Sequence, residues 1–149
     1  MELSRVVAGY TRVEHRIWGL SVVRVPSEWL EKAKFFYERA RSDLEQGVYW
    51  AACFEAHQSV ELILKGLQVA IIGVHEFTHD LVRLLRGLQE AGLEVPEELI
   101  VYADALTPHY TMARYPGRKP VVYDEDAGRR CVEYARRLWE WAESVAKDP

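Results

Sequence analysis

The chain has few of the residues that would mark a secreted or membrane protein. Only two cysteines, Cys53 and Cys131, occur among its 149 residues, and asparagine is absent. Both cysteines lie among apolar helical positions, so we expect small buried side chains in preference to a disulfide or a metal site. No apolar run is long enough to cross a bilayer or to serve as a secretory signal. We therefore expect a cytoplasmic protein that does not associate with membranes.

The net charge is only −4, which argues against a protein coated with nucleic acid. The basic residues nevertheless gather late in the chain, so a local basic face is possible. The absence of asparagine and the abundance of charged residues fit a thermophile. The late basic residues are Arg114, Arg118, Lys119, Arg129, Arg130, Arg136 and Arg137.

The apolar residues from Ser27 onward recur at three- and four-residue steps, which predicts helices. We expect helices over about 27–46, 49–72, 78–91, 97–110 and 124–145, separated by glycines, prolines and short loops. Pro108 should kink the end of the fourth helix. The predicted fold class is all-α: an antiparallel up-and-down four-helix bundle core with an additional short helix.

Residues 1–25 carry no clear periodicity and contain Gly9 and Gly19. They form an N-terminal extension for which a helix, a hairpin or an arm onto a partner remain open. The helical bundle is expected to occupy residues 26–149.

The pentapeptide His75-Glu76-Phe77-Thr78-His79 spells H-E-x-x-H, the zinc signature of many metalloproteases. A zinc peptidase would need both imidazoles on one helical turn and a third ligand. Gly73 comes just before the motif, so His75 and Glu76 are expected in an interhelical loop, with Thr78 or His79 at the next helix entrance. Zinc therefore stays a remote alternative, and we expect no cofactor.

Three separated motifs, taken in order, resemble the HEPN family of small helical proteins over roughly residues 27–146. The first is Gln58-Ser59-Val60-Glu61 followed by Lys65, the second is His79-Asp80-Leu81, and the third is Arg114-Tyr115-Pro116. In that family the His-Asp-Leu segment opens a helix. The resemblance therefore accounts for His79 without zinc.

The resemblance implies a nucleotide- or RNA-binding subunit that forms homodimers and pairs with a minimal nucleotidyltransferase in a toxin–antitoxin-like module. Such a subunit would have no catalysis of its own. The residues themselves allow a binding site, because arginine holds phosphate and aromatic rings stack on bases. The candidate nucleotide-binding residues are Tyr110, Arg114, Tyr115, His57, Glu61, Lys65 and His79.

Each of these residues also has a structural interpretation. Glu61 and Lys65 lie four apart and can form an intrahelical ion pair. Arg114 can pack on the carbonyls of its own helix and on Tyr110 by a cation–π contact. His57 can be satisfied inside the fold.

The main alternative function is a metal-independent ribonuclease, which is the activity of other branches of the HEPN family. Those enzymes use an arginine followed by a histidine after four to six residues. No arginine in this sequence has a histidine at that spacing. The nearest substitute is the reversed pair of His109 and Arg114.

Overall fold

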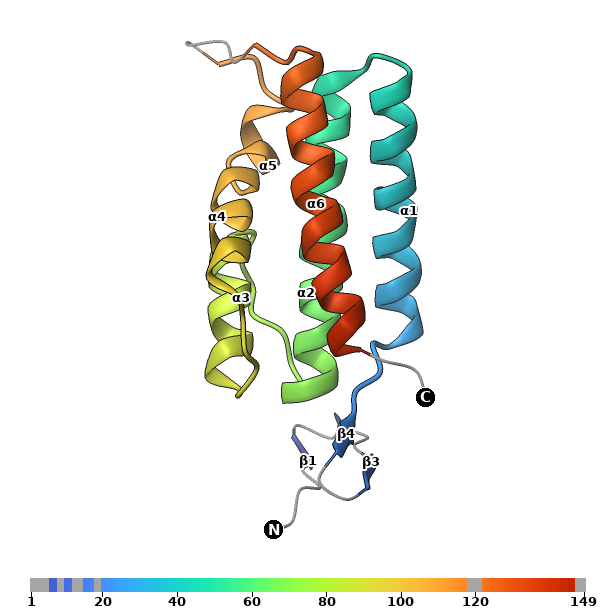
Figure 1. Cartoon of the computed structure of the whole chain (residues 1–149), viewed down its shortest axis with the longest axis vertical. Coiled ribbons are helices and arrows are strands. Elements are labelled where there is room, and N and C mark those ends of the chain that lie inside the picture. The colour runs from blue at the N-terminus through green and yellow to red at the C-terminus, as the bar shows by residue number, and fades with distance from the viewer. Residues whose placement is uncertain (1–5, 8–9, 12–14, 18–19, 118–121, 147–149) are drawn as a thin grey trace.

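The protein is described by a computed structural model that covers residues 6–7, 10–11, 15–17, 20–117 and 122–146. Within these residues, a long helical bundle follows four very short strands (Figure 1). The helices are α1 (Ser27–Glu45), α2 (Tyr49–Ile72), α3 (Leu81–Glu90), α4 (Glu97–Leu106), α5 (His109–Met112) and α6 (Glu125–Val145).

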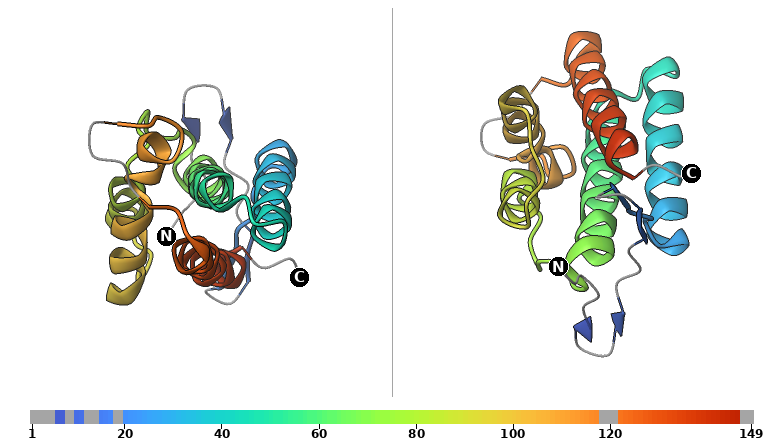
Figure 2. Two further views of the ribbon diagram at one scale, coloured as in Figure 1. Left: turned by 90° about the horizontal axis from the view of Figure 1, so that it is seen from above. Right: turned by 60° about the horizontal axis from the view of Figure 1, so that its bottom comes forward.

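The helix α2 is the central element of the bundle, and it packs against α1, α3, α5 and α6. Its apolar face is wide enough to contact several neighbours at once, as expected for a helix buried on most sides. Along the chain, α1, α2, α4 and α6 run in alternating directions, and α3 is an extra helix in the connection between α2 and α4 (Figures 1 and 2). This confirms the predicted all-α, up-and-down four-helix core.

Glycines end three helical segments where the sequence predicts breaks. Gly47, Gly73 and Gly92 all have positive φ angles, of 80°, 98° and 107°. Gly73 is the C-cap of α2, and its amide donates to the carbonyls of Gln68 and Val69. The break that separates the first histidine of the pentapeptide from α2 is therefore a left-handed glycine cap.

Two predicted helix boundaries were wrong. The third helix begins at Leu81 and not near Thr78, because the Asp80 carboxylate accepts hydrogen bonds from the amides of Val82 and Arg83 and so makes Asp80 the N-cap. The fourth helix does not continue to Tyr110. It ends at Leu106, and α5 starts anew after Pro108.

The first strands form two antiparallel hairpins. Strand β1 (Val6–Val7) pairs with β2 (Tyr10–Thr11), and β3 (His15–Ile17) pairs with β4 (Leu20–Val22). Of the three conformations left open for residues 1–25, the described part therefore adopts the hairpin.

The prediction of two unlinked cysteines was wrong. Cys53 of α2 and Cys131 of α6 form a disulfide, with their Cα atoms 5.1 Å apart and 78 residues between them in sequence. Both side chains are buried, as predicted, but α2 and α6 pack side by side and bring the two positions together. The pairing depends on the packing of two helices, which sequence spacing does not reveal.

None of the helices in the described part of the chain combines the length and the apolar character needed to cross a membrane.

Candidate functional site

The pentapeptide lies in the loop between α2 and α3, as predicted, and its side chains face different partners. The His75 ring packs against Trp29, with centroids 5.0 Å apart, while the Glu76 carboxylate pairs with Arg83 at 2.6 Å. Among the described residues, His75, Glu76 and His79 do not belong to any group of three side chains close enough to share a metal ion. The loop therefore does not have the geometry of a zinc peptidase.

Gln68 fixes this loop to the bundle. Its buried amide group donates to the Glu76 carboxylate at 2.8 Å and to the Leu84 carbonyl at 3.1 Å, and its oxygen accepts from the Glu76 amide at 2.8 Å. All three hydrogen bonds come from one buried side chain, so the loop has a defined path. That path brings His79 back over α2.

Glu61 of α2 is the polar centre of the site. It is buried, it accepts a hydrogen bond from Lys65 Nζ at 2.8 Å, and its two oxygens lie 3.1 Å from His79 Nδ1. Lys65 is buried as well, so the predicted ion pair forms inside the protein and not on its surface. A buried carboxylate needs such partners, and here they also orient His79.

His57 of α2 also holds the loop between α2 and α3. Its ring is fully buried, and Nε2 donates to the backbone carbonyl of His79 at 3.0 Å. Burial lowers the pKa of His57, although the His79 carbonyl and the Glu61 carboxylate oppose the shift. His57 is therefore neutral at pH 7 and acts as a fixed hydrogen-bond donor.

Aromatic and cationic groups form the outer part of the site. The rings of His79 and Tyr110 stack with centroids 3.8 Å apart, and the guanidinium carbon of Arg114 lies 4.5 Å from the Tyr110 ring centroid. The same carbon lies 4.8 Å from the Phe54 ring and 5.0 Å from the Tyr115 ring. Arg114 is thus surrounded by three aromatic rings.

Arg114 is oriented by a backbone carbonyl four residues earlier in the chain. Its Nε donates to the Tyr110 carbonyl at 2.7 Å, which is the structural contact that the sequence suggested. Within the described ranges, no carboxylate pairs with Arg114 and no hydrogen bond is formed by its two terminal nitrogens. The guanidinium edge is therefore available to an anion while its face is held by the rings.

A pocket of about 320 Å³ opens beside Arg114. The exposed rings of Trp50 and Tyr115 contribute flat aromatic surface to it. Tyr123 and Trp50 were missed by the sequence reasoning, and no local signal marks them, because they come from different parts of the chain. The lining residues are Trp50, Met112, Ala113, Arg114, Tyr115, Pro116 and Tyr123.

All seven predicted site residues lie in one connected cluster, but they divide by depth. His57, Glu61 and Lys65 are buried, whereas the side chain of His79 is 52% exposed. His57 and Glu61 contact His79 of the outer part, and Lys65 contacts Glu61. The seven are Tyr110, Arg114, Tyr115, His57, Glu61, Lys65 and His79.

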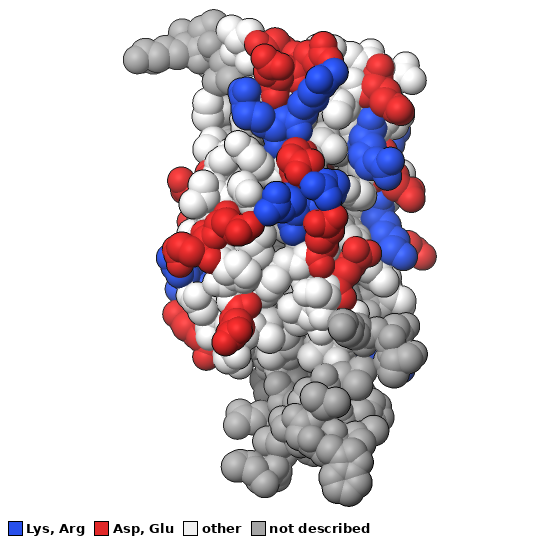
Figure 3. Space-filling model, viewed as in Figure 1, with Lys and Arg blue, Asp and Glu red and all other residues white. Residues whose placement is uncertain are grey.

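The predicted basic face does not extend along α6. Arg129 pairs with Glu125, Arg136 pairs with Glu133 and Glu140, and Arg137 reaches Glu98 of α4. Figure 3 shows the result on one face of the molecule, where basic and acidic side chains alternate. Arg118 and Lys119 lie outside the described residues.

Comparisons with known proteins agree with the motifs. The sequence model of the HEPN domain matches residues 26–145. No protein of curated function matches the chain.

Three solved structures share the fold. The protein TT1696 from Thermus thermophilus is 31% identical with a TM-score of 0.74, and the match covers 80% of this chain and 96% of that one. ST0689, an archaeal HEPN homologue, is 27% identical with a TM-score of 0.66 and coverages of 83% and 98%. A HEPN domain protein from Thermotoga maritima is 26% identical with a TM-score of 0.64 and coverages of 79% and 96%. The chain therefore belongs to the HEPN domain family.

Proposed function

We propose that this chain is a nucleotide- or RNA-binding subunit without catalytic chemistry of its own, and that it acts with a minimal nucleotidyltransferase in a toxin–antitoxin-like module. The binding proposal rests on the surroundings of the Arg114 guanidinium group. Its face is covered by three aromatic rings and its edge has no carboxylate partner among the described residues.

A guanidinium group held in this way is suited to phosphate. Its orientation is already fixed by the hydrogen bond to the Tyr110 carbonyl, so little side-chain freedom remains to be lost on binding. The adjoining pocket supplies the exposed rings of Tyr115 and Trp50, on which a base can stack. A phosphate with a neighbouring base is the chemistry common to nucleotides and RNA.

The buried members of the cluster act as a support for this site. His57 and Glu61 hold His79 by its backbone carbonyl and its ring, and His79 in turn stacks on Tyr110. Tyr110 provides both a ring and a carbonyl to Arg114. The buried polar residues therefore contribute to affinity through position and not through contact with the ligand.

The ribonuclease alternative lacks an arranged pair of catalytic groups. His109 Nδ1 is hydrogen-bonded to the Tyr123 hydroxyl at 2.6 Å, and burial, His57 and Arg130 lower the pKa of His109. Arg114 is engaged with the Tyr110 carbonyl instead. With no arginine at the required spacing before a histidine, we expect long incubation with single-stranded RNA to leave the RNA intact.

Isothermal titration with ATP and with a short single-stranded RNA tests the binding site. We expect Arg114→Ala to weaken binding about 10- to 100-fold, since a hydrogen bond to a charged group contributes about 1.5–3 kcal/mol. Arg129→Ala is the matched control, because Arg129 is exposed and ion-paired on α6. Equal affinity of Arg114→Ala and the unmodified chain would exclude this site.

The partner and the homodimer need their own tests. We expect the chain to co-elute with a minimal nucleotidyltransferase of the same organism when the two proteins are co-expressed. Sedimentation velocity of the chain alone should give the mass of a dimer. A monomer that does not bind the transferase would remove the partner proposal and leave the binding site to be judged by titration.

A further inference from the structure

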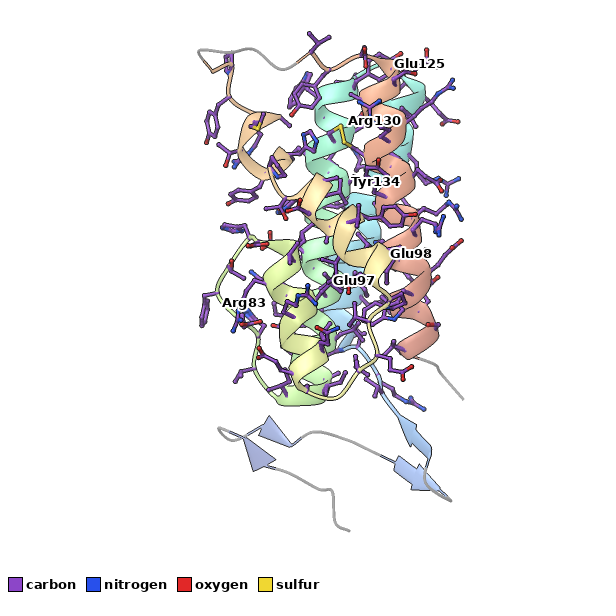
Figure 4. All side chains as sticks on the ribbon, turned by 60° about the vertical axis from the view of Figure 1, so that its left-hand side comes forward. Arg83, Glu97, Glu98, Glu125, Arg130 and Tyr134 are labelled. Carbon is purple, nitrogen blue, oxygen red and sulfur yellow. A yellow bond between two sulfur atoms is a disulfide. The ribbon has the colours of Figure 1, made fainter. Side chains whose placement is uncertain are left out.

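The two cysteines and one histidine of the bundle form a compact group beside the His79 cluster. Cys53 of α2, Cys131 of α6 and His109 of α5 each have a potential ligand atom within 4.8 Å of the other two. All three come from different helices, so the group is a product of the packing. Figure 4 shows the disulfide that joins the cysteines, close to Arg130 and Tyr134.

The donor set matches a borderline or soft metal ion. Two thiolates and an imidazole are ligands that Zn²⁺ accepts in proteins, with a water molecule or another ligand in the fourth position. We propose that the reduced form of this chain binds one such ion, Zn²⁺ in particular, through Cys53, Cys131 and His109. The inference does not depend on the proposed nucleotide site.

His109 is already oriented by a second side chain. Its Nδ1 lies 2.6 Å from the Tyr123 hydroxyl, and when Nδ1 is the donor the lone pair is on Nε2. Histidines that bind metals are usually held in this way by a hydrogen bond from the other ring nitrogen. In the proposed site Nε2 is the ligand atom, and Tyr123 orients the ring through Nδ1.

A pocket gives access to the group. It has a volume of about 190 Å³ and reaches both His109 and Cys131. An ion can enter through it, and a water molecule can occupy the fourth position. The lining residues are Ala105, His109, Val122, Ala127, Arg130, Cys131 and Tyr134.

The protein can adjust to the ion with small movements. Two sulfurs at about 2.3 Å from a tetrahedral Zn²⁺ lie about 3.8 Å apart. The Cα atoms of Cys53 and Cys131 are 5.1 Å apart, so side-chain rotation allows this once the disulfide is broken. In the disulfide form Cys53 Sγ lies 3.4 Å from the Ala127 carbonyl oxygen, so this oxygen can accept a hydrogen bond from the Cys53 thiol once the disulfide is reduced.

The disulfide and the metal site exclude each other, and the steps between them balance. A dithiol reductant breaks the S–S bond, supplies two electrons and two protons, and becomes a disulfide itself. Zn²⁺ then replaces the two thiol protons, which pass to solvent. The redox state of the pair would therefore decide whether the chain binds metal.

Titration of the reduced full-length chain with Co²⁺ tests the proposal. Cys53 and Cys131 are the only cysteines, so a thiolate-to-cobalt charge-transfer band can arise only from them. We expect one equivalent of Co²⁺ per chain, displaced by Zn²⁺, and no band from the disulfide form. A reduced chain that shows no band would overturn the proposal.

Two variants separate a formed site from binding by loose thiols. His109→Gln should keep part of the band but weaken Co²⁺ binding at least tenfold, because one of three protein ligands is lost. His75→Gln, in the loop pentapeptide, is the matched control and should bind like the unmodified chain. If His109→Gln binds Co²⁺ as tightly as the unmodified chain, the ion is held by the thiols alone and the three-residue site does not exist.

Discussion

The imidazole ring of His79 stacks on the phenol ring of Tyr110, with centroids 3.8 Å apart and planes 14° apart. The contact joins the loop after α2 to the short helix α5. Glu61 and His57 hold the His79 side of the stack, and the Arg114 guanidinium lies against the Tyr110 ring. This pair therefore connects the buried polar residues to the half-buried guanidinium of Arg114.

The Tyr110 ring should matter more than its hydroxyl group. Tyr110→Leu removes the stack and the cation–π contact, which together contribute about 1–2 kcal/mol, so we expect nucleotide affinity to fall about tenfold in isothermal titration. Tyr110→Phe is the matched control and should retain affinity, because the hydroxyl makes no hydrogen bond with other described residues. An equal loss in both variants would assign the effect to the hydroxyl.

The buried pair of Lys65 and Glu61 should be needed for stability. Lys65→Met leaves His79 as the one side chain hydrogen-bonded to the Glu61 carboxylate among the described residues, and we expect the free energy of unfolding to drop by about 1–3 kcal/mol in urea titrations. Lys32→Met on the exposed side of α1 is the control and should change stability by less than about 0.5 kcal/mol. An unchanged free energy of unfolding in Lys65→Met would show that the pair has little structural importance.

Gly87 of α3 should not tolerate alanine. A Cβ atom at this position would lie 2.8 Å from Gln68 Nε2 and closer still to the Glu76 carboxylate. We expect Gly87→Ala to lower the unfolding free energy by about 1–3 kcal/mol, despite the higher helix propensity of alanine, because the Gln68–Glu76 hydrogen bond must move. Gly117→Ala meets open space and is the control for thermal unfolding. If Gly87→Ala and the unmodified chain had equal melting temperatures, the loop at Glu76 would be able to move away without loss of stability.

Glu55 should make stability depend on pH. Burial, a hydrogen bond with Asp43 and the charge of Asp43 raise the pKa of Glu55 to about 8, against the attraction of Arg39. The unfolded chain loses this proton near pH 4.5 and the folded chain only near pH 8, so stability falls as pH rises between these values. Glu55→Gln should remove this decline.

Urea titrations at several pH values measure the effect. We expect Glu55→Gln to be about 1–2 kcal/mol more stable than the unmodified chain at pH 8, with the difference shrinking toward pH 4.5. Exposed Glu94→Gln should give curves parallel to those of the unmodified chain. A stability difference that is the same at all pH values would contradict the shifted pKa.

The helices, their order and the main breaks follow from the sequence, because they depend on contacts between residues near in the chain. The apolar period of α2 and the left-handed Gly73 after it are local features, and so is the position of His75 in a loop. The HEPN family could also be recognised from the sequence, since its motifs keep their order along the chain. The start of α3 was missed because the Asp80 cap competes with Thr78 and His79 at adjacent positions.

The contacts between side chains of different helices are determined by the tertiary structure and cannot be predicted from the sequence pattern. The disulfide of Cys53 and Cys131, the depth of Lys65 and the stack of His79 on Tyr110 all depend on how helices distant in sequence pack together. Sequence patterns report the face of a helix on which a residue lies but not the neighbour opposite it. That neighbour is fixed by the packing of the whole bundle, where burial and shape act over many residues at once.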